Sequence, residues 1–143
     1  MKPRKFTLVS GKGRLRVWGN IFLVPGGIIL HLFGGERPHL GAVAIGLPRP
    51  SLSGSGRSST TSVYAFLGHK DDEVARPAAS RLAAELGLAA VVLAGVHVEG
   101  AAPGEIAVLA RRARQVTSLA IKVLKGRNIR LCPRQPGLKP SQQ

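Results

Sequence analysis

The chain has 143 residues, of which 44% are hydrophobic, enough apolar material for one domain with a modest core. This composition excludes a disordered protein, and the single cysteine, Cys132, excludes a disulfide framework within the chain. The net charge of +14 is concentrated at the two ends, because residues 1–16 and 122–143 contain no acid, and such ends attract polyanions.

Neither a secretory signal nor a membrane span is expected. The basic N-terminal run is not followed by an uninterrupted apolar segment. The longest apolar stretch, residues 21–33, is interrupted by Pro-Gly-Gly at 25–27 and is too short to cross a bilayer. We therefore expect a cytoplasmic protein.

The first half of the chain predicts strands. Alternating or continuous apolar runs joined by glycine-rich and proline-rich turns indicate strands at residues 7–10, 14–24, 28–33, 41–46 and 62–67. The turn at 25–27 should join the second and third runs as a hairpin. Residues 51–62, which are rich in serine, are expected to form a loop that closes over a ligand.

The second half predicts helix, strand and helix. Apolar residues at helical spacing run from Val74 to Leu86, where Gly87 suits the C-terminal cap; Pro77 should bend this helix or delay its start. Residues 90–98 are a candidate central strand, and a second helix should begin near Pro103, bury Ile106 in its apolar stripe and end at Gly126.

The order of these elements predicts an α+β fold, with antiparallel sheet packed against two main helices. We expect a single domain over residues 1–126. Residues 127–143 form a basic, proline-rich tail that we expect to be disordered.

Three segments at strand ends combine glycines with ionisable side chains: residues 34–39, 48–51 and 68–72. Glycine lets backbone amides approach a ligand, and Arg, Lys and hydroxyl groups donate hydrogen bonds to phosphate. A helix that starts just after Lys70 adds its positive dipole end. The three segments therefore predict one anion-binding mouth, with phosphate as the preferred group.

Each feature also has a structural interpretation. Asp71 and Asp72 are suited to cap the following helix, and Arg49 between two prolines suits a rigid solvated turn. His97 is either a hydrogen-bonded core residue or a site residue. A metal site made of histidines with Asp71 or Asp72 is a weaker hypothesis, because no tight ligand spacing is present; its histidines are His39, His69 and His97.

Four motifs in order resemble those of the prenylated flavin chaperone family, the small LpdD-like D subunits of gallate and 4-hydroxybenzoate decarboxylases. They are Gly34-Gly35-x-x-Pro38-His39-x-Gly41-Ala42-Val43-Ala44, Pro48-Arg49-Pro50-Ser51, Gly68-His69-Lys70-Asp71-Asp72 and Ala94-Gly95-Val96-His97-Val98. The resemblance covers residues 15–124, and it implies a fold similar to the proteasome-assembly chaperones.

The resemblance also implies binding of prenylated FMN, protection or delivery of it to a UbiD-type decarboxylase, and a homodimer. Carried onto this chain, it makes cofactor-contact candidates of Arg37, His39, Arg49, Ser51, Ser59, Ser62, His69 and Lys70. On physical grounds we expect Arg49 and Lys70 to bind the phosphate. No residue is assigned a catalytic or metal-binding role.

The leading hypothesis is therefore a non-catalytic cofactor carrier. The alternative is a nucleic-acid-binding module that uses the basic termini, whose affinity would fall steeply with salt. A third hypothesis, a small enzyme with chemistry at His69 and Asp71 or Asp72, predicts turnover by the isolated protein.

Overall fold

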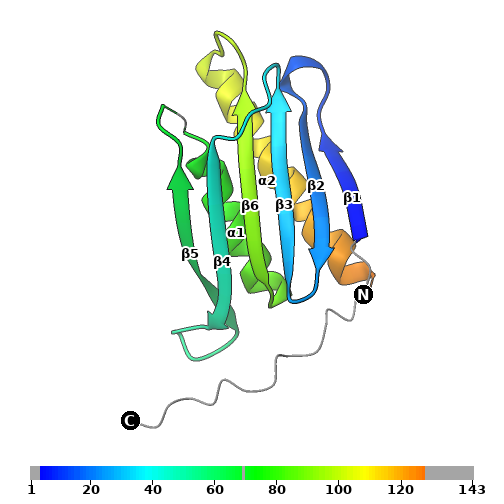
Figure 1. Cartoon of the computed structure of the whole chain (residues 1–143), viewed down its shortest axis with the longest axis vertical. Coiled ribbons are helices and arrows are strands. Elements are labelled where there is room, and N and C mark those ends of the chain that lie inside the picture. Colours follow the sequence, from blue (N-terminus) through cyan, green and yellow to red (C-terminus); the bar gives the residue numbers. More distant parts are fainter. Residues whose placement is uncertain (1–3, 69, 128–143) are drawn as a thin grey trace.

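The computed structural model describes residues 4–68 and 70–127, which form one six-stranded sheet with two helices on one face (Figure 1). The strands are β1 (Arg4–Ser10), β2 (Val17–Val24), β3 (Gly27–Gly35), β4 (Ala42–Pro50), β5 (Arg57–Ala65) and β6 (Ala89–His97). The helices are α1 (Asp72–Leu86) and α2 (Pro103–Gly126), with a short 3-10 helix η1 (Gly13–Leu15) before β2. The α+β prediction is confirmed.

The strand order is β1-β2-β3-β6-β4-β5, and every neighbouring pair is antiparallel except β3 and β6. Because β6 lies between β3 and β4, the segment 36–41 must cross β6 to connect them. The strands β3, β5 and β6 end, and both helices begin, at the end drawn at the top of Figure 1, which we call the upper end. The β2–β3 turn and the β4–β5 loop lie at the lower end. Gly87 lies there as well, because it borders a hollow with Pro48, Arg49 and Pro50.

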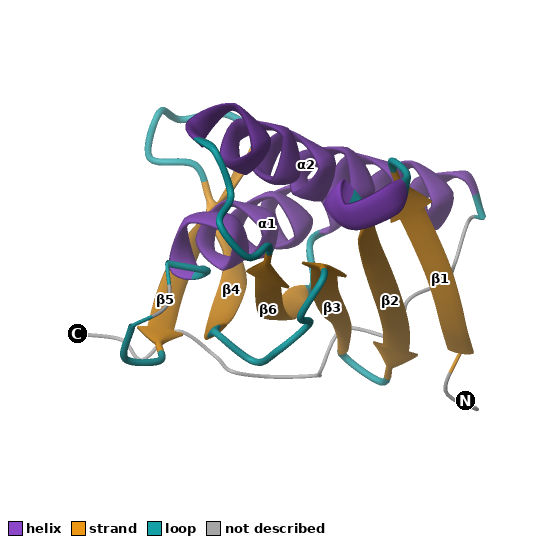
Figure 2. Ribbon diagram, turned by 90° about the horizontal axis from the view of Figure 1, so that it is seen from above, coloured by secondary structure: helices purple, strands orange, loops and turns teal. Residues whose placement is uncertain are grey.

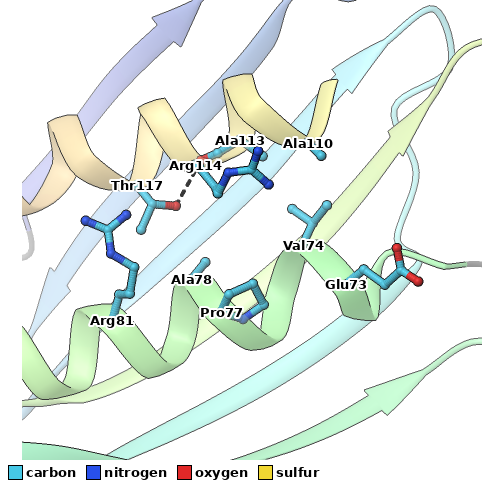
Figure 3. Close-up of a pocket in the computed structure, with 9 residues that line it drawn as sticks. All are labelled: Glu73, Val74, Pro77, Ala78, Arg81, Ala110, Ala113, Arg114 and Thr117. Carbon is cyan, nitrogen blue, oxygen red and sulfur yellow. Dashed lines mark hydrogen bonds between the residues drawn. The ribbon is translucent and has the colours of Figure 1, made fainter. Parts of the chain in front are cut away.

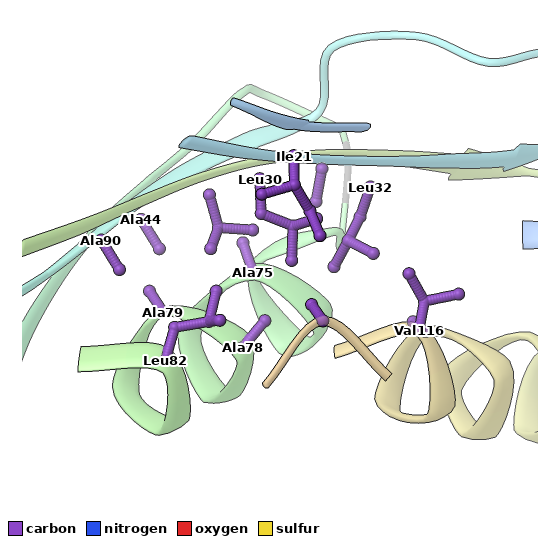
Figure 4. Close-up of a cluster of buried hydrophobic side chains, with 14 of the residues drawn as sticks. Ile21, Leu30, Leu32, Ala44, Ala75, Ala78, Ala79, Leu82, Ala90 and Val116 are labelled. Carbon is purple, nitrogen blue, oxygen red and sulfur yellow. The ribbon is translucent and has the colours of Figure 1, made fainter. Parts of the chain in front are cut away.

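The core lies between the sheet and the helices. Strand β2 alternates strictly between buried and half-buried positions, so that Val17, Ile21 and Leu23 face the helices. They pack with the apolar stripes of α1 and α2 (Figure 4). Gly46 of β4 lets α1 come close, because an added Cβ there would overlap the backbone of Ala79. The other face of the sheet carries no helix (Figure 2).

The sequence places most elements correctly and misplaces several strand boundaries. Residues 13–15 form η1 instead of the start of a strand, because Gly13 adopts a positive φ of 61°. Residues 57–62 belong to β5, where β4 supplies their backbone partners, so the serine-rich loop shortens to 51–56. Helix α1 begins at Asp72 and contains Pro77, which rules out a later start. Within the described residues, no helix is long and apolar enough to cross a membrane.

Candidate functional site

A cavity of about 470 Å³ opens at the upper end, between the first turns of α1 and α2 and the end of β6. This volume lies in the range typical of small-molecule sites. Its lining combines an apolar wall with ionisable groups: His39, Gly68, Lys70, Asp71, Glu73, Val74, Val96, His97, Val98, Ala101, Ile106, Leu109, Ala110 and Arg114.

The apolar wall comes mainly from α2 and the end of β6. Val98 and Leu109 are buried, whereas Ile106 is 57% exposed. The prediction that Ile106 belongs to the buried stripe is therefore wrong. The first turn of α2 borders the cavity, and the exposed Ile106 side chain extends the apolar stripe of this helix to the cavity surface. Such a surface suits a planar apolar ligand.

Asp71 is the most buried ionisable residue in the cavity, with only 6% of its surface exposed. Its Oδ1 accepts a hydrogen bond from the Val96 backbone N–H at 2.9 Å, and its Oδ2 lies 2.9 Å from His39 Nε2. It stands at the N-cap of α1 but makes no capping hydrogen bond. The interpretation of Asp71 as a helix cap is wrong, since its carboxylate ties the start of α1 to β6 and to His39.

His39 is carried by the crossover segment 36–41, which passes over β6 on the face without helices (Figures 1 and 2). Its Nδ1 lies 3.1 Å from the carbonyl oxygen of Arg37, so both ring nitrogens contact acceptors. A protonated ring would donate to both and hold a positive charge against Asp71.

Glycines make this crossing feasible. A Cβ at Gly95 would overlap the backbone of His39, and one at Gly41 would overlap the Asp71 carboxylate. The backbone N–H groups of Glu36 and Arg37 donate to the carbonyl oxygen of His97 at 2.8 and 3.3 Å. The glycines of the first and fourth motifs therefore serve the close packing of this crossover.

Two permanent cations and a second imidazole also line the cavity. Lys70 precedes α1 and Arg114 comes from α2, while His97 ends β6. Arg114 is not among the candidates taken from the sequence; its position eight residues, about two helical turns, after Ile106 was the available signal. Arg37, by contrast, is absent from the lining and lies 3.6 Å from Glu99 at the surface.

A narrow crease of about 40 Å³ extends the cavity between the helices. It shares four lining residues with the cavity: Glu73, Val74, Ala110 and Arg114. Arg114 from α2 and Arg81 from α1 both reach into the space between the helices (Figure 3). A ligand anchored in the cavity could extend a negatively charged group toward this pair.

His97 is a site residue and not a core residue. Its side chain is 46% exposed, its ring lies edge-on to that of His39 at 6.0 Å, and its Nε2 is 3.5 Å from a Glu99 oxygen. Of the two interpretations left open by the sequence, the structure supports the second.

The second motif does not join this cavity. Arg49 lies near the lower end of β4, in a separate hollow of about 450 Å³ with Pro48, Pro50, Arg57 and others. At about 3.3 Å per residue, the stretch of β4 from Ala42 to Arg49 is roughly 23 Å long. The prediction of one mouth formed by all three segments is therefore wrong, because β4 carries the second segment to the opposite end.

The three predicted serines are spread along the β4–β5 pair, from its lower-end loop to the upper half of β5, and none of them lines the upper-end cavity. The Ser51 hydroxyl lies 2.7 Å from that of Ser53 in the β4–β5 loop, and the Ser59 hydroxyl lies 2.8 Å from that of Ser80 on α1. Ser62 sits in β5 opposite Ile45. Arg49 itself donates to the Thr60 hydroxyl and to the carbonyl oxygen of Pro50, both at 3.1 Å.

His69 lies outside the described residues, and so does any contact it makes. Among residues 4–68 and 70–127, no three His, Cys, Asp or Glu side chains are grouped as a metal site requires. The described lining of the cavity contains no hydroxyl or thiol side chain. The lining offers an apolar wall for a ring, two permanent cations for an anion, two imidazoles, and the carboxylates of Asp71 and Glu73.

Comparison with known proteins agrees with this architecture. A family model described as the prenylated flavin chaperone LpdD-like domain matches residues 11–125. A chain from the crystal structure of a novel chaperone complex for yeast 20S proteasome assembly has a TM-score of 0.56, 12% identity, and coverage of 88% of this chain and 98% of that one. At this identity the likeness shows the fold alone. No curated protein matches significantly.

Proposed function

Because the chain belongs to the prenylated flavin chaperone LpdD-like family, we propose that it binds prenylated FMN in the upper-end cavity and protects it or delivers it to a UbiD-type decarboxylase. In this role the protein acts in the cytoplasm as a homodimer. It is an accessory protein without catalytic turnover of its own.

The observation that carries the proposal is that an apolar wall, with Ile106 exposed in it, and two permanent cations line one cavity. The isoalloxazine and its prenyl-derived ring lie against Ile106 and Leu109, where burial of apolar area favours binding by about 25 cal/mol per Å². Lys70 and Arg114 pair with the phosphate, and Arg114 adds a planar fork of donors. His39 and His97 contribute ring-nitrogen contacts.

The other cofactor-contact candidates taken from the sequence fall into two groups. Arg37 and His69 are proposed to contact the cofactor from the two segments that carry His39 and Lys70. Four other candidates lie outside the cavity, so this proposal assigns them no cofactor contact, and the Arg49→Ala control below tests that assignment; they are Arg49, Ser51, Ser59 and Ser62.

The test is an anaerobic titration of the purified protein with prenylated FMN, with plain FMN as a control ligand. We expect stoichiometric binding that prefers the prenylated form. The double variant Lys70→Ala/Arg114→Ala should lose at least about tenfold in affinity, since each charged hydrogen bond contributes about 1.5 kcal/mol or more.

The matched control is Arg49→Ala/Arg57→Ala, which removes the same number of cations from the lower-end hollow. It should bind prenylated FMN as the wild type does. If it loses the cofactor while Lys70→Ala/Arg114→Ala keeps it, the site lies at the lower end and the assignment to the upper cavity is wrong. Absence of binding to every form overturns the cofactor proposal itself.

Delivery is tested separately, by mixing the loaded protein with an apo-decarboxylase of the UbiD type under air. The proposal expects more active enzyme than an equal amount of free prenylated FMN produces, because a bound cofactor is shielded from oxidation. An equal or lower yield would argue against protection and delivery.

A further inference from the structure

A second hollow, of about 500 Å³, lies along α2 and shares one lining residue, Arg114, with the upper-end cavity. Six residues of α2 line it, and all six are exposed. Spacings of three and four positions connect them, so they follow one face of the helix over roughly 17 Å at about 1.5 Å per residue. We call this set the α2 stripe: Arg111, Arg114, Gln115, Ser118, Leu119 and Lys122.

The α2 stripe carries positive charge that no acid of its own helix balances. After Glu105, α2 contains five cations and no acid. Arg112 is occupied, because it donates to the carbonyl oxygen of Leu15 at 2.6 Å. Lys125 lies 3.0 Å from a Glu85 oxygen. The other three form no ion pair within the part of the chain that the structure describes; they are Arg111, Arg114 and Lys122.

An apolar side chain lies among these cations, since Leu119 is 40% exposed. The polar members of the stripe are already bonded to neighbouring elements. Gln115 accepts a hydrogen bond from the Ser10 hydroxyl at 2.6 Å, and the Ser118 hydroxyl accepts one from Arg81 at 3.0 Å. The stripe therefore presents three cations and one apolar contact, which an amphipathic acidic helix would match.

This combination favours a segment of an acidic protein over a nucleic acid. Single-stranded nucleic acid binds where aromatic side chains alternate with cations, because its bases stack on the rings. Helix α2 contains no aromatic residue. A helix that bears carboxylates and an apolar residue supplies a partner for the cations and for Leu119 alike.

Arg114 connects the α2 stripe with the proposed cofactor site. It lines the hollow, the upper-end cavity and the crease between the helices. Figure 3 shows its side chain in the space between α2 and α1. A carboxylate docked on the stripe and a phosphate in the cavity would share this one guanidinium and repel each other. Occupation of one place therefore weakens binding at the other.

We propose that the α2 stripe docks an acidic segment of the protein that receives the cofactor, and that Arg114 couples this docking to cofactor release. The inference rests on the proposed function, to which it adds the docking surface and the release step. Docking lowers the affinity for the cofactor, and by reciprocity the bound cofactor lowers the affinity for the partner by the same factor.

The first test needs no cofactor. The probe is a fluorescein-labelled peptide designed as an amphipathic helix of glutamates and leucines, and its anisotropy is measured with the full chain at low salt. The variant Arg111→Glu/Lys122→Glu should bind the peptide at least about tenfold more weakly than the wild type, because attraction becomes repulsion. Both residues are exposed, so the circular dichroism spectrum should be unchanged.

The matched control is Lys5→Glu/Arg57→Glu, which makes the same change of net charge on the edge strands β1 and β5. It should bind the peptide as the wild type does. A wild type that does not bind the peptide, or equal losses in the two variants, would overturn the docking surface. Tighter binding of a single-stranded oligonucleotide of equal charge, lost in Arg111→Glu/Lys122→Glu, would identify nucleic acid as the occupant and reject the acidic partner.

The second test measures the affinity for prenylated FMN with and without saturating peptide. The wild type should lose about fivefold when the peptide is bound. Arg114→Gln should bind the cofactor more weakly from the start, with no further loss on addition of peptide. Arg111→Glu/Lys122→Glu lies outside the cavity lining, so it should keep the cofactor without peptide and yet fail in the delivery assay.

The results separate this inference from the proposed function. A wild type that binds prenylated FMN equally well with and without bound peptide would overturn the coupling and leave the cofactor site intact. Delivery by Arg111→Glu/Lys122→Glu at the wild-type level would overturn docking through the stripe. Absence of cofactor binding would overturn the proposed function and the coupling together, while peptide binding in the first test would still establish the docking surface.

Discussion

The two ends of the sheet contain similar residue types and use them differently. At the upper end, the Asp71 carboxylate is buried between the Val96 N–H group and His39, and the cavity wall continues the apolar stripe of α2. At the lower end, Arg49 and Arg57 border a hollow with prolines and glycines, and Arg49 is satisfied by its own strand pair.

The difference shows what makes a glycine-rich, basic segment part of a site. At the upper end, the crossover segment 36–41 passes so close to β6 that Gly95 has no room for a side chain. The buried Asp71 carboxylate there holds the start of α1 to β6 and to His39. The lower end is a strand turn whose polar groups are paired locally. Substitutions at the upper end should therefore lower the free energy of unfolding more than those at the lower end, because they disturb close backbone packing and a buried carboxylate.

The largest effect is expected from Gly95→Val. The added Cβ would overlap the His39 backbone, so the crossover must move off β6, and overpacking of this kind costs about 3 kcal/mol. Urea unfolding should show a lower midpoint with loss of flavin binding. Gly104→Ala is the control, because nothing lies near its added Cβ. Equal midpoints for the two variants would mean that the crossing does not constrain the upper end.

A smaller loss is expected from Asp71→Ala. The substitution leaves the buried Val96 N–H group without its acceptor and His39 without its carboxylate, which should lower the free energy of unfolding by about 2 kcal/mol. Asp72→Ala removes the neighbouring half-exposed acid and should cost about 0.5 kcal/mol. Chemical denaturation measures both free energies of unfolding. A larger loss in Asp72→Ala than in Asp71→Ala would contradict the structural role given to Asp71.

At the lower end, Gly87→Ala should cost about 1 kcal/mol, because Gly87 caps α1 with a φ of 69° that disfavours residues with a side chain. Its new neighbour would be the flexible Arg57 guanidinium, which can move away. Flavin affinity should be unchanged. A loss as large as that of Gly95→Val would remove the distinction between the two ends.

The smallest effect concerns pH, and it should be alike at both ends. A hydrogen bond from Arg14 lowers the pKa of Glu105 at the upper end, and one from Lys125 lowers the pKa of Glu85 at the lower end. Each lowered pKa contributes stability that is complete above the ordinary value of 4.5 and is lost as the pH falls through the lowered value.

The acid dependence of the urea midpoint should therefore become shallower in Arg14→Gln and in Lys125→Gln. Both pairs are exposed to solvent, so the change is small and should vanish in high salt. If the acid dependence of the urea midpoint is unchanged in both variants at low salt, other carboxylates control that dependence.

Local pattern was sufficient to predict most elements of the fold. The helical spacing from Val74 to Leu86, the Gly87 cap and the Pro-Gly-Gly turn each depend on neighbours within a few residues, and each was confirmed. The central position of β6 followed from its continuous apolar run, and its place in the strand order confirms it.

The site was only half predictable, because its assembly depends on strand order. His39 and Asp71 meet because β3 and β5 end at the same end of the sheet, whereas β4 runs back and carries Arg49 away. The insertion of β6 between β3 and β4 involves partners far apart in sequence, which periodicity does not encode. The burial of Asp71 and the exposure of Ile106 follow from that insertion.

The insertion of β6 also governs how the chain reaches its fold during synthesis. Two incomplete sheets, β1-β2-β3 and β4-β5, leave the ribosome first, and each keeps an unpaired inner edge until β6 pairs Gly27 with Ala89 and Ala42 with Ala94. Such non-local pairing is slow, and open strand edges invite aggregation. A nascent chain stalled before residue 89 is therefore expected to aggregate instead of folding as a smaller domain.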